Sequence, residues 1–119
     1  MGTAQPFRVI LVEDEALIMM DLEQGLAEEG VEVAGVAGTL DDAMVLARTA
    51  DYDAAVFDID LQGEEVFPAA EIARERGNPF IFFSGHADAR RLRGTYPDVP
   101  LVQKPATAHQ IYAALRNVA

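Results

Sequence analysis

Five short runs of apolar residues are spaced along the chain, and most of them are followed by a segment in which apolar residues recur with a helical period. Runs of about four to eight apolar residues that are bounded by turn signals are typical of strands buried in a parallel sheet. We predict strands at about Phe7 to Val12, Val31 to Val36, Ala54 to Phe57, Phe80 to Phe83 and Val99 to Gln103. Strands that alternate with helices form βα units, so the pattern predicts an α/β fold with a parallel sheet.

Capping signals indicate where the helices between these strands begin. Thr39 and Thr107 are each followed, three residues later, by a polar side chain that can complete a capping box. Another helix is expected to begin near Pro68, because proline is tolerated in the first turn of a helix. The segment from Ala87 to Arg93 is short and polar, so we expect only a short or frayed helix after the fourth strand.

The length and composition of the chain suit one small folded domain. With 119 residues, the chain can bury one hydrophobic core but has no room for a second folding unit. We predict a single domain over residues 1–119, with an ordered core at about 7–118 and no output domain. Half of the residues are hydrophobic, which argues against disorder beyond the first few residues.

Charge and cysteine content exclude several kinds of function. The formal net charge is -11, so the protein as a whole repels nucleic-acid phosphates and anionic lipids. Cysteine is absent, which excludes disulfides, thiolate metal sites and thiol nucleophiles. No apolar run approaches the roughly 20 residues that span a bilayer. We therefore expect a cytoplasmic protein that binds neither nucleic acid nor membrane.

Residues that could handle a phosphoryl group follow four of the five predicted strands. Glu13 and Asp14 follow the first strand, Asp58 the third, Ser84 the fourth, and Lys104, the only lysine, the fifth. The carboxyl ends of parallel strands lie at one edge of a sheet, and ligands bind at that edge in open α/β sheets. We expect these five side chains to converge on one pocket.

The combination of acids, a hydroxyl and an ammonium is suited to phosphoryl transfer to a carboxylate. Mg²⁺ prefers oxygen ligands, and Glu13, Asp14 and Asp58 can supply them. Asp58 can itself be the nucleophile, because an aspartate can form an aspartyl phosphate while a metal ion screens its repulsion from the incoming group. The Lys104 ammonium and the Ser84 hydroxyl could then contact phosphate oxygens.

In this order, the five residues resemble the signature of the receiver domain of bacterial response regulators, which act in two-component signalling. The resemblance extends from Arg8 to the end of the chain and includes the pair Lys104-Pro105. It implies a flavodoxin-like fold, a doubly wound parallel sheet with the strand order 2-1-3-4-5. It also implies that a sensor histidine kinase or a histidine phosphotransfer protein donates a phosphoryl group to Asp58, and that water later removes this group slowly.

The same resemblance implies a composition for the metal site. Asp14 would bind Mg²⁺ directly, and Glu13 would bind it through a water molecule. Asp58, the phosphoacceptor, would also face the ion, and the backbone carbonyl of Asp60 would complete the site. Mg²⁺ is the only cofactor that the resemblance implies.

For the residues after the fourth and fifth strands, the resemblance implies contacts with the phosphoryl group. Lys104 would pair with it, and Ser84 would move to contact it. The peptide bond between Lys104 and Pro105 would be cis, a conformation that is inexpensive only before proline. Most receivers have an aromatic residue three positions before the lysine, where this chain has Leu101. We therefore expect the output switch to differ from the usual aromatic one.

Some features resemble the FAT GUY subgroup of mostly stand-alone receivers. They are the sequence of residues 77–85, the late Pro68 and the weak helical signal after Ser84. We expect a single-domain response regulator, a monomer or weak dimer, that signals by binding a protein partner or acts as a phosphate sink. Such a protein is a phosphoacceptor and not an enzyme.

Two other functions are compatible with parts of this pattern. The sequence Asp58-Ile-Asp60 also resembles the DxD motif of haloacid-dehalogenase-type phosphatases, in which Asp60 would be the acid/base. That family has its metal-binding acids after the lysine, whereas residues 107–119 here contain neither Asp nor Glu. The second alternative is an interaction module that works without phosphorylation, but all five reactive positions are filled.

Overall fold

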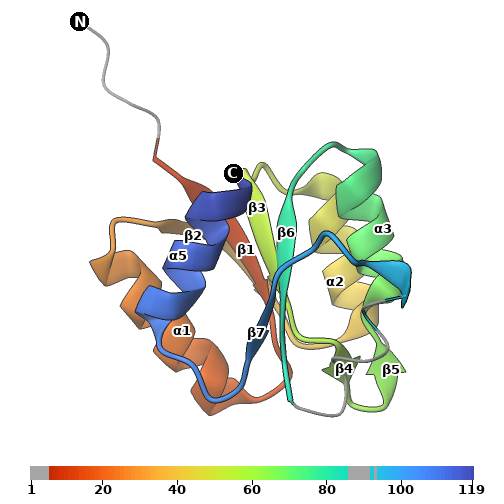
Figure 1. Ribbon diagram of the computed structural model, residues 1–119, viewed down its shortest axis with the longest axis horizontal. Helices are drawn as coiled ribbons and strands as arrows, with labels where there is room; N and C mark the ends of the chain where they lie inside the picture. Colours follow the sequence, from red (N-terminus) through yellow and green to blue (C-terminus); the bar gives the residue numbers. More distant parts are fainter. Residues whose placement is uncertain (1–5, 86–91, 93) are drawn as a thin grey trace, which may run out of the picture.

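A parallel sheet of five strands forms the middle layer of the protein, with helices on both of its faces (Figure 1). The computed structural model describes residues 6–85, 92 and 94–119. The strands of the sheet are β1 (Arg8–Val12), β2 (Glu32–Ala37), β3 (Ala54–Phe57), β6 (Phe80–Ser84) and β7 (Leu101–Gln103). The helices with defined bounds are α1 (Ala16–Glu28), α2 (Leu40–Thr49), α3 (Phe67–Glu75) and α5 (Ala108–Val118).

The strands are ordered β2-β1-β3-β6-β7, and all neighbouring strands are parallel. When the strands of this sheet are counted along the chain, this is the order 2-1-3-4-5, so the predicted flavodoxin-like, doubly wound fold is confirmed. Helices α1 and α5 cover one face, and α2 and α3 cover the other (Figure 1). The strand order reverses at β1 and β3, and the carboxyl ends of strands at such a point form the expected ligand site.

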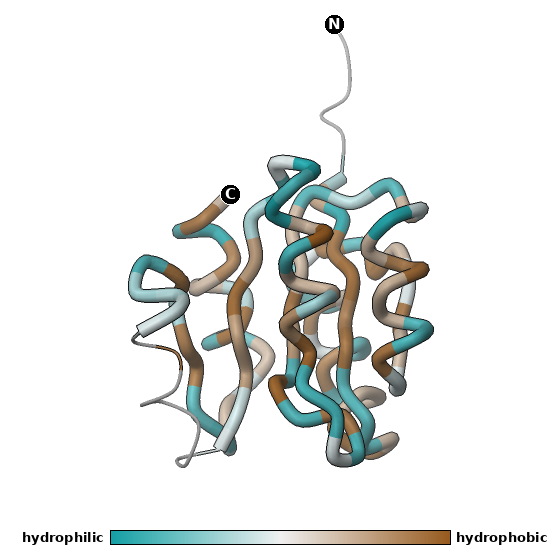
Figure 2. The backbone as a smooth tube through the Cα atoms, turned by 90° about the vertical axis from the view of Figure 1, so that its right-hand side faces the viewer, coloured by the Kyte–Doolittle hydropathy of each residue, from teal (hydrophilic) through white to brown (hydrophobic). Residues whose placement is uncertain are grey.

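The core consists of two apolar layers, one on each face of the sheet. All four residues of β3 are buried, and they alternate between the layers. Ala55 and Phe57 belong to the layer beside α2 and α3, whereas Ala54 and Val56 belong to the layer beside α1 and α5. In Figure 2 the strands pass through the middle of the molecule as mainly hydrophobic segments. A strand that is buried on both faces is apolar throughout, which is the pattern that predicted it.

Aromatic rings are concentrated in the layer between the sheet and α3. The ring centroid of Tyr96 lies 5.1 Å from that of Phe82 and 5.5 Å from that of Phe67. The Tyr96 hydroxyl donates a hydrogen bond of 2.5 Å to Glu71 Oε2, and the Arg74 guanidinium carbon lies 4.9 Å from the Tyr96 ring centroid. Burial and the Glu71 carboxylate raise the pKa of Tyr96. These contacts join α3 to the segment that leads into β7.

The helix starts agree with the capping signals. Thr39 Oγ1 accepts a hydrogen bond from the amide of Asp42 at the beginning of α2. Thr107 and Gln110 form a complete capping box at the beginning of α5, because each side chain bonds to the backbone of the other residue. Pro68 lies in the first turn of α3. Within the described residues, no helix is long and apolar enough to cross a membrane.

A small hairpin is the main departure from the expected elements. Strands β4 (Asp60–Leu61) and β5 (Glu64–Glu65) pair antiparallel after β3, where the sequence predicts only a loop. The turn residues Gln62 and Gly63 have φ angles of 55° and 88°, in the left-handed region. Strands of two residues are too short to show an alternating pattern. The short helix expected at 87–93 lies, but for one residue, outside the described residues.

Candidate functional site

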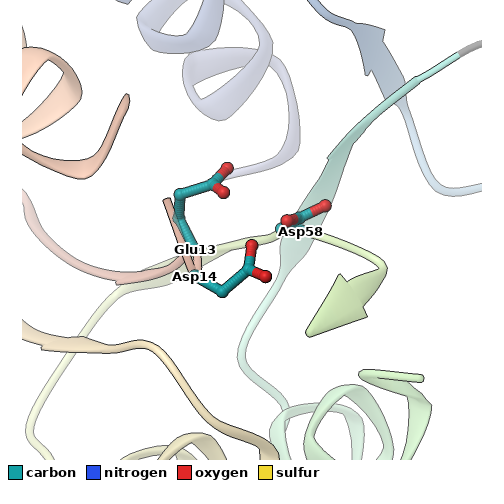
Figure 3. Close-up of side chains that lie close together, drawn as sticks. All are labelled: Glu13, Asp14 and Asp58. Atoms are coloured by element: carbon teal, nitrogen blue, oxygen red, sulfur yellow. The ribbon is translucent and has the colours of Figure 1, made fainter. Parts of the chain in front are cut away.

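Glu13 and Asp58 are brought side by side by the pairing of β1 with β3. Val12 is paired with Phe57, and the amide of Asp58 donates a hydrogen bond of 2.8 Å to the carbonyl of Val12. Asp14 follows Glu13, and one carboxylate oxygen of each of the three acids lies within 4.8 Å of the others. Figure 3 shows the three side chains gathered at these two strand ends.

Ser84 and Lys104 reach the same edge through the pairing of β6 with β7. Ser84 is paired with Gln103, and the amide of Lys104 donates a hydrogen bond of 2.9 Å to the carbonyl of Ser84. Ser84 is only 2% exposed. The peptide bond between Lys104 and Pro105 is cis, as the family resemblance implies. The side chains of both residues are therefore held at the carboxyl edge of the sheet.

The Lys104 ammonium joins the fifth strand to two of the three acids. Its Nζ lies 2.8 Å from Glu13 Oε2 and 3.3 Å from Asp58 Oδ2. The side chains of these acids are almost fully buried, and the lysine side chain is 20% exposed. Two buried carboxylates share one ammonium, and the partly buried Asp14 adds a third carboxylate. The cluster therefore concentrates negative charge in a region with little water.

The pKa of Asp58 reflects this environment. Burial raises the pKa of Asp58 to about 8, and the neighbouring Glu13 charge adds to the effect, while the Lys104 charge offsets only part of it. For Lys104, burial lowers the pKa, but hydrogen bonding to Glu13 and the charge of Asp58 raise it by more. Burial and the Glu13 charge therefore disfavour the ionised form of Asp58, whereas the Lys104 charge favours it.

Backbone amides hold two of the acids in place. Glu13 Oε1 accepts a hydrogen bond of 3.1 Å from the amide of Glu15 at the start of α1. Asp14 Oδ2 accepts a hydrogen bond of 3.2 Å from the amide of Gln62. Because Gln62 is in the turn between β4 and β5, this second bond attaches the hairpin to the acid cluster.

The side chain of Asp60 has a different part in the structure. Its Oδ1 accepts a hydrogen bond of 2.9 Å from the amide of Gly63, which closes the hairpin turn. Among the described residues, the acids grouped at metal-ligand spacing are Glu13, Asp14 and Asp58, without the Asp60 side chain. The family resemblance implies that the backbone carbonyl of Asp60 belongs to the metal site, and this role stays a prediction.

The acid cluster has the properties of a divalent-cation site. Carboxylate oxygens are ligands that Mg²⁺ prefers, and Glu13, Asp14 and Asp58 offer one each at suitable spacing. Glu13 Oε2 is buried, and its close contact with the Lys104 ammonium is an ion pair. Three carboxylates outnumber the one ammonium, and a divalent cation would balance the remaining charge. The residues therefore fit Mg²⁺.

Two contacts of the site were not predicted from the sequence. The Nζ of Lys104 lies over the ring of Phe83, 5.1 Å from its centroid. The other contact is the hydrogen bond from the Gln62 amide to Asp14. Alternation along a strand indicates that Phe82 and Phe83 face opposite layers, but only the pairing of β6 with β7 places the lysine over the second ring.

Known protein families and characterised proteins include relatives of this chain. The family model of the response regulator receiver domain matches residues 9–116. The transcriptional regulatory protein PdtaR of Mycobacterium tuberculosis is 42% identical over 79 residues. The aligned region is 66% of this chain but only 38% of that protein, so the chain matches well under half of the length of this curated relative.

Solved structures resemble this chain over nearly its whole length. A response regulator receiver protein from Sinorhizobium medicae is 29% identical with a TM-score of 0.83, covering 95% of this chain and 94% of that chain. SdrG from Sphingomonas melonis is 32% identical with a TM-score of 0.82, covering 96% of this chain and 97% of that chain. The response regulator PhyR from Brucella abortus is 32% identical with a TM-score of 0.81, covering 96% of this chain but 48% of that chain.

Proposed function

This chain belongs to the family of response regulator receiver domains, and from that premise we propose that it accepts a phosphoryl group on Asp58. The observation that carries the proposal is the position of the Asp58 carboxylate. It is buried, it lies within 4.8 Å of carboxylate oxygens of Glu13 and Asp14, and the Lys104 ammonium lies 3.3 Å from its Oδ2. A nucleophile in this position has a candidate metal site and a positive charge beside it.

The proposed donor is a phosphohistidine of a sensor histidine kinase or of a histidine phosphotransfer protein. A carboxylate oxygen of Asp58 attacks the phosphorus atom, and the bond between phosphorus and the imidazole nitrogen breaks. The electron pair of that bond stays on the nitrogen, and the product is an aspartyl phosphate. Lys104 would pair with the phosphoryl oxygens, and the Ser84 hydroxyl would donate a hydrogen bond to one of them.

Four residues are proposed to hold Mg²⁺ during this transfer. Asp14 and Asp58 would bind the ion with their carboxylates, Glu13 would bind it through a water molecule, and Asp60 would bind it through its backbone carbonyl. The ion would supply positive charge that offsets the repulsion between the acids and the phosphoryl group. The raised pKa of Asp58 supports this assignment, because the carboxylate has to be ionised to attack and the metal-free cluster disfavours ionisation.

Removal of the phosphoryl group is proposed to be slow hydrolysis. Water attacks the phosphorus atom, the bond between phosphorus and the Asp58 oxygen breaks, and the products are the free carboxylate, inorganic phosphate and one proton. The protein would thus be a signalling phosphoacceptor and not an enzyme that turns over a substrate. The order of the acids argues against the phosphatase alternative, because Glu13 and Asp14, which lie beside Asp58, precede the lysine in the sequence, whereas that family has its metal-binding acids after the lysine.

The phosphorylated protein is proposed to signal by binding a protein partner, or to drain phosphoryl groups from a kinase. We propose a cytoplasmic monomer or weak dimer that binds neither nucleic acid nor membrane. The net charge of -11 supports the proposed lack of nucleic-acid and membrane binding, because it repels phosphate backbones and anionic lipid surfaces.

Intact-mass spectrometry tests the proposal directly. With Mg²⁺ present, acetyl phosphate or phosphoramidate is expected to add one phosphoryl group to the wild-type protein. Asp58→Asn should prevent the addition, whereas Asp60→Asn, which alters the second acid of the phosphatase-like motif, should still allow it. Wild-type protein that stays unmodified would contradict the proposal. Continuous release of phosphate from a phosphomonoester would support the phosphatase alternative instead.

A further inference from the structure

Phe83 directly precedes Ser84 in β6, and its ring lies against the lysine of the site. Side chains alternate along the strand, so Phe82 packs with the rings beside α3, whereas Phe83 belongs to the layer beside α1 and α5. Phe83 is 3% exposed. The Lys104 Nζ lies 5.1 Å from its ring centroid, which is within the range of a cation–π contact.

The pairing of β6 with β7 fixes the direction from which the lysine approaches. Val102 is paired with Phe83 and packs against the layer beside α1 and α5, and Lys104 follows two residues later. The Lys104 ammonium therefore contacts the ring as well as the carboxylates of Glu13 and Asp58. Each of these three contacts restrains the same nitrogen atom.

Phe83 and Lys104 both line a surface groove between α1 and the segment that follows β7. The groove has a volume of about 640 Å³ and is lined mainly by apolar side chains of α1 together with Phe83, Lys104 and Pro105. Of the described residues that line the groove, Phe83 alone is aromatic. It is therefore the only one of them that can hold a cation with a ring face.

The ring and the carboxylates restrain the ammonium in different ways. Lysine has a flexible stem, so holding its ammonium near the acceptor costs side-chain entropy. The carboxylates of Glu13 and Asp58 are both needed for the proposed chemistry, one at the metal and one at the phosphoryl group. The Phe83 ring carries no net charge, is fixed in the core and has no other partner in that chemistry. The ring can therefore still contact the ammonium when the acids bind a metal ion or the phosphoryl group.

We propose that Phe83 is a positioning residue for Lys104, because its ring face holds the ammonium beside the acceptor carboxylate before the phosphoryl group arrives. The kinetic part of this inference rests on the proposed function of Asp58. The contact itself exists in the unphosphorylated protein, so it can be tested separately. Phe83 acts only through the lysine and touches none of the reacting atoms.

Nuclear magnetic resonance of the lysine side chain tests the contact. Because Lys104 is the only lysine, isotope-labelled lysine gives a single set of side-chain signals. An aromatic ring face shifts nearby protons upfield, so the Hε protons of Lys104 are expected upfield of their position in a free lysine. Phe83→Leu should remove this shift, and Phe83→Tyr, which keeps the ring, should preserve it. Phe82→Leu, which removes a ring from the opposite layer, is the control and should also preserve it.

The rate of phosphorylation by phosphoramidate tests the positioning role. Phe83→Leu is expected to slow the reaction about 3- to 30-fold, whereas Phe83→Tyr and Phe82→Leu should react at close to the wild-type rate. If Phe83→Leu does not fold, Phe83→Met replaces it in both measurements, because methionine adapts to core gaps.

Either of two results would overturn the inference. One is a Lys104 signal that does not change in Phe83→Leu, and the other is a changed signal with an unchanged phosphorylation rate. If the wild-type protein is not phosphorylated at all, the proposed function fails. The Lys104 signal then still decides whether Phe83 holds the lysine.

Discussion

The ammonium of Lys104 lies 2.8 Å from Oε2 of Glu13. The lysine therefore contacts an acid of the proposed metal site in addition to the proposed acceptor, Asp58, at 3.3 Å. A cation at the acid cluster would compete with the lysine for the same carboxylate. The positions of the lysine and of the metal are thus coupled through Glu13.

Replacing Glu13 with Gln is expected to weaken Mg²⁺ binding about 10- to 100-fold, because the cluster loses one charge. The pKa of Asp58 should fall in the metal-free variant, because the Glu13 charge is one cause of its elevation. Calorimetric titration measures the affinity, and nuclear magnetic resonance of labelled aspartate measures the pKa. Glu15→Gln changes an exposed neighbour and should alter neither quantity. Equal Mg²⁺ affinities in the two variants would refute the prediction.

Asp58 should make the stability of the metal-free protein depend on pH. Folding raises the pKa of Asp58 from its ordinary value of 3.8 to about 8, so its contribution is complete below about pH 4 and is lost as the pH rises through 8. Asp58→Asn cannot ionise. The free energy of unfolding of Asp58→Asn should therefore rise relative to that of the wild type by about 1–3 kcal/mol between about pH 5 and about pH 9. Urea unfolding in a metal chelator measures the difference, and an advantage that is the same at both pH values would be evidence against it.

Tyr96→Phe is expected to lower the free energy of unfolding by about 1–2 kcal/mol, because it removes a hydrogen bond to the charged Glu71 and keeps the ring. The midpoint of urea unfolding should fall accordingly. Tyr112→Phe, on α5 at the other face of the sheet, is a matched control and should have a smaller effect. Identical losses in the two variants would show that the bond between Tyr96 and Glu71 contributes little.

Gly25 permits the close packing of α1 against α5, because a Cβ atom at this position would lie 2.3 Å from the Cβ of Ala108. Gly25→Ala is expected to destabilise the protein by about 1–3 kcal/mol, although alanine favours helices over glycine. Ala108→Gly removes the opposing methyl group, so the double variant should recover most of the loss. Thermal unfolding of the two single variants and the double variant measures this recovery. Simple addition of the two single effects would exclude a steric cause.

Most of the sheet could be predicted because its strands are apolar on both faces. The run Ala54–Phe57 has the same bounds in the sequence pattern and in the structure, since all four of its residues are buried. The last strand begins at Leu101 and not at Val99, because Pro100 has no amide hydrogen to donate to the sheet. The hairpin formed by β4 and β5 could not be predicted, since two-residue strands carry no periodic signal.

The residues of the site could be predicted, but their contacts could not. The rule that parallel strands share an edge indicates that Glu13, Asp58 and Lys104 meet. It does not indicate that the lysine lies closer to Glu13 than to Asp58, because that depends on side-chain torsions. In the sequence, Phe83 has the properties of an ordinary core residue. Only the register of β6 and β7 places its ring against the lysine.

The hydrogen bond from the Gln62 amide to Asp14 connects the acid cluster to an amide at the protein surface. Gln62 is exposed at the tip of the hairpin, whereas Glu13 and Asp58 are buried. Any event that redirects the Asp14 carboxylate lengthens or shortens this bond, so it changes the chemical environment of one surface amide. Binding of a metal ion at the acid cluster can therefore be followed in the native protein through the signal of the Gln62 amide, without altering any of the acids.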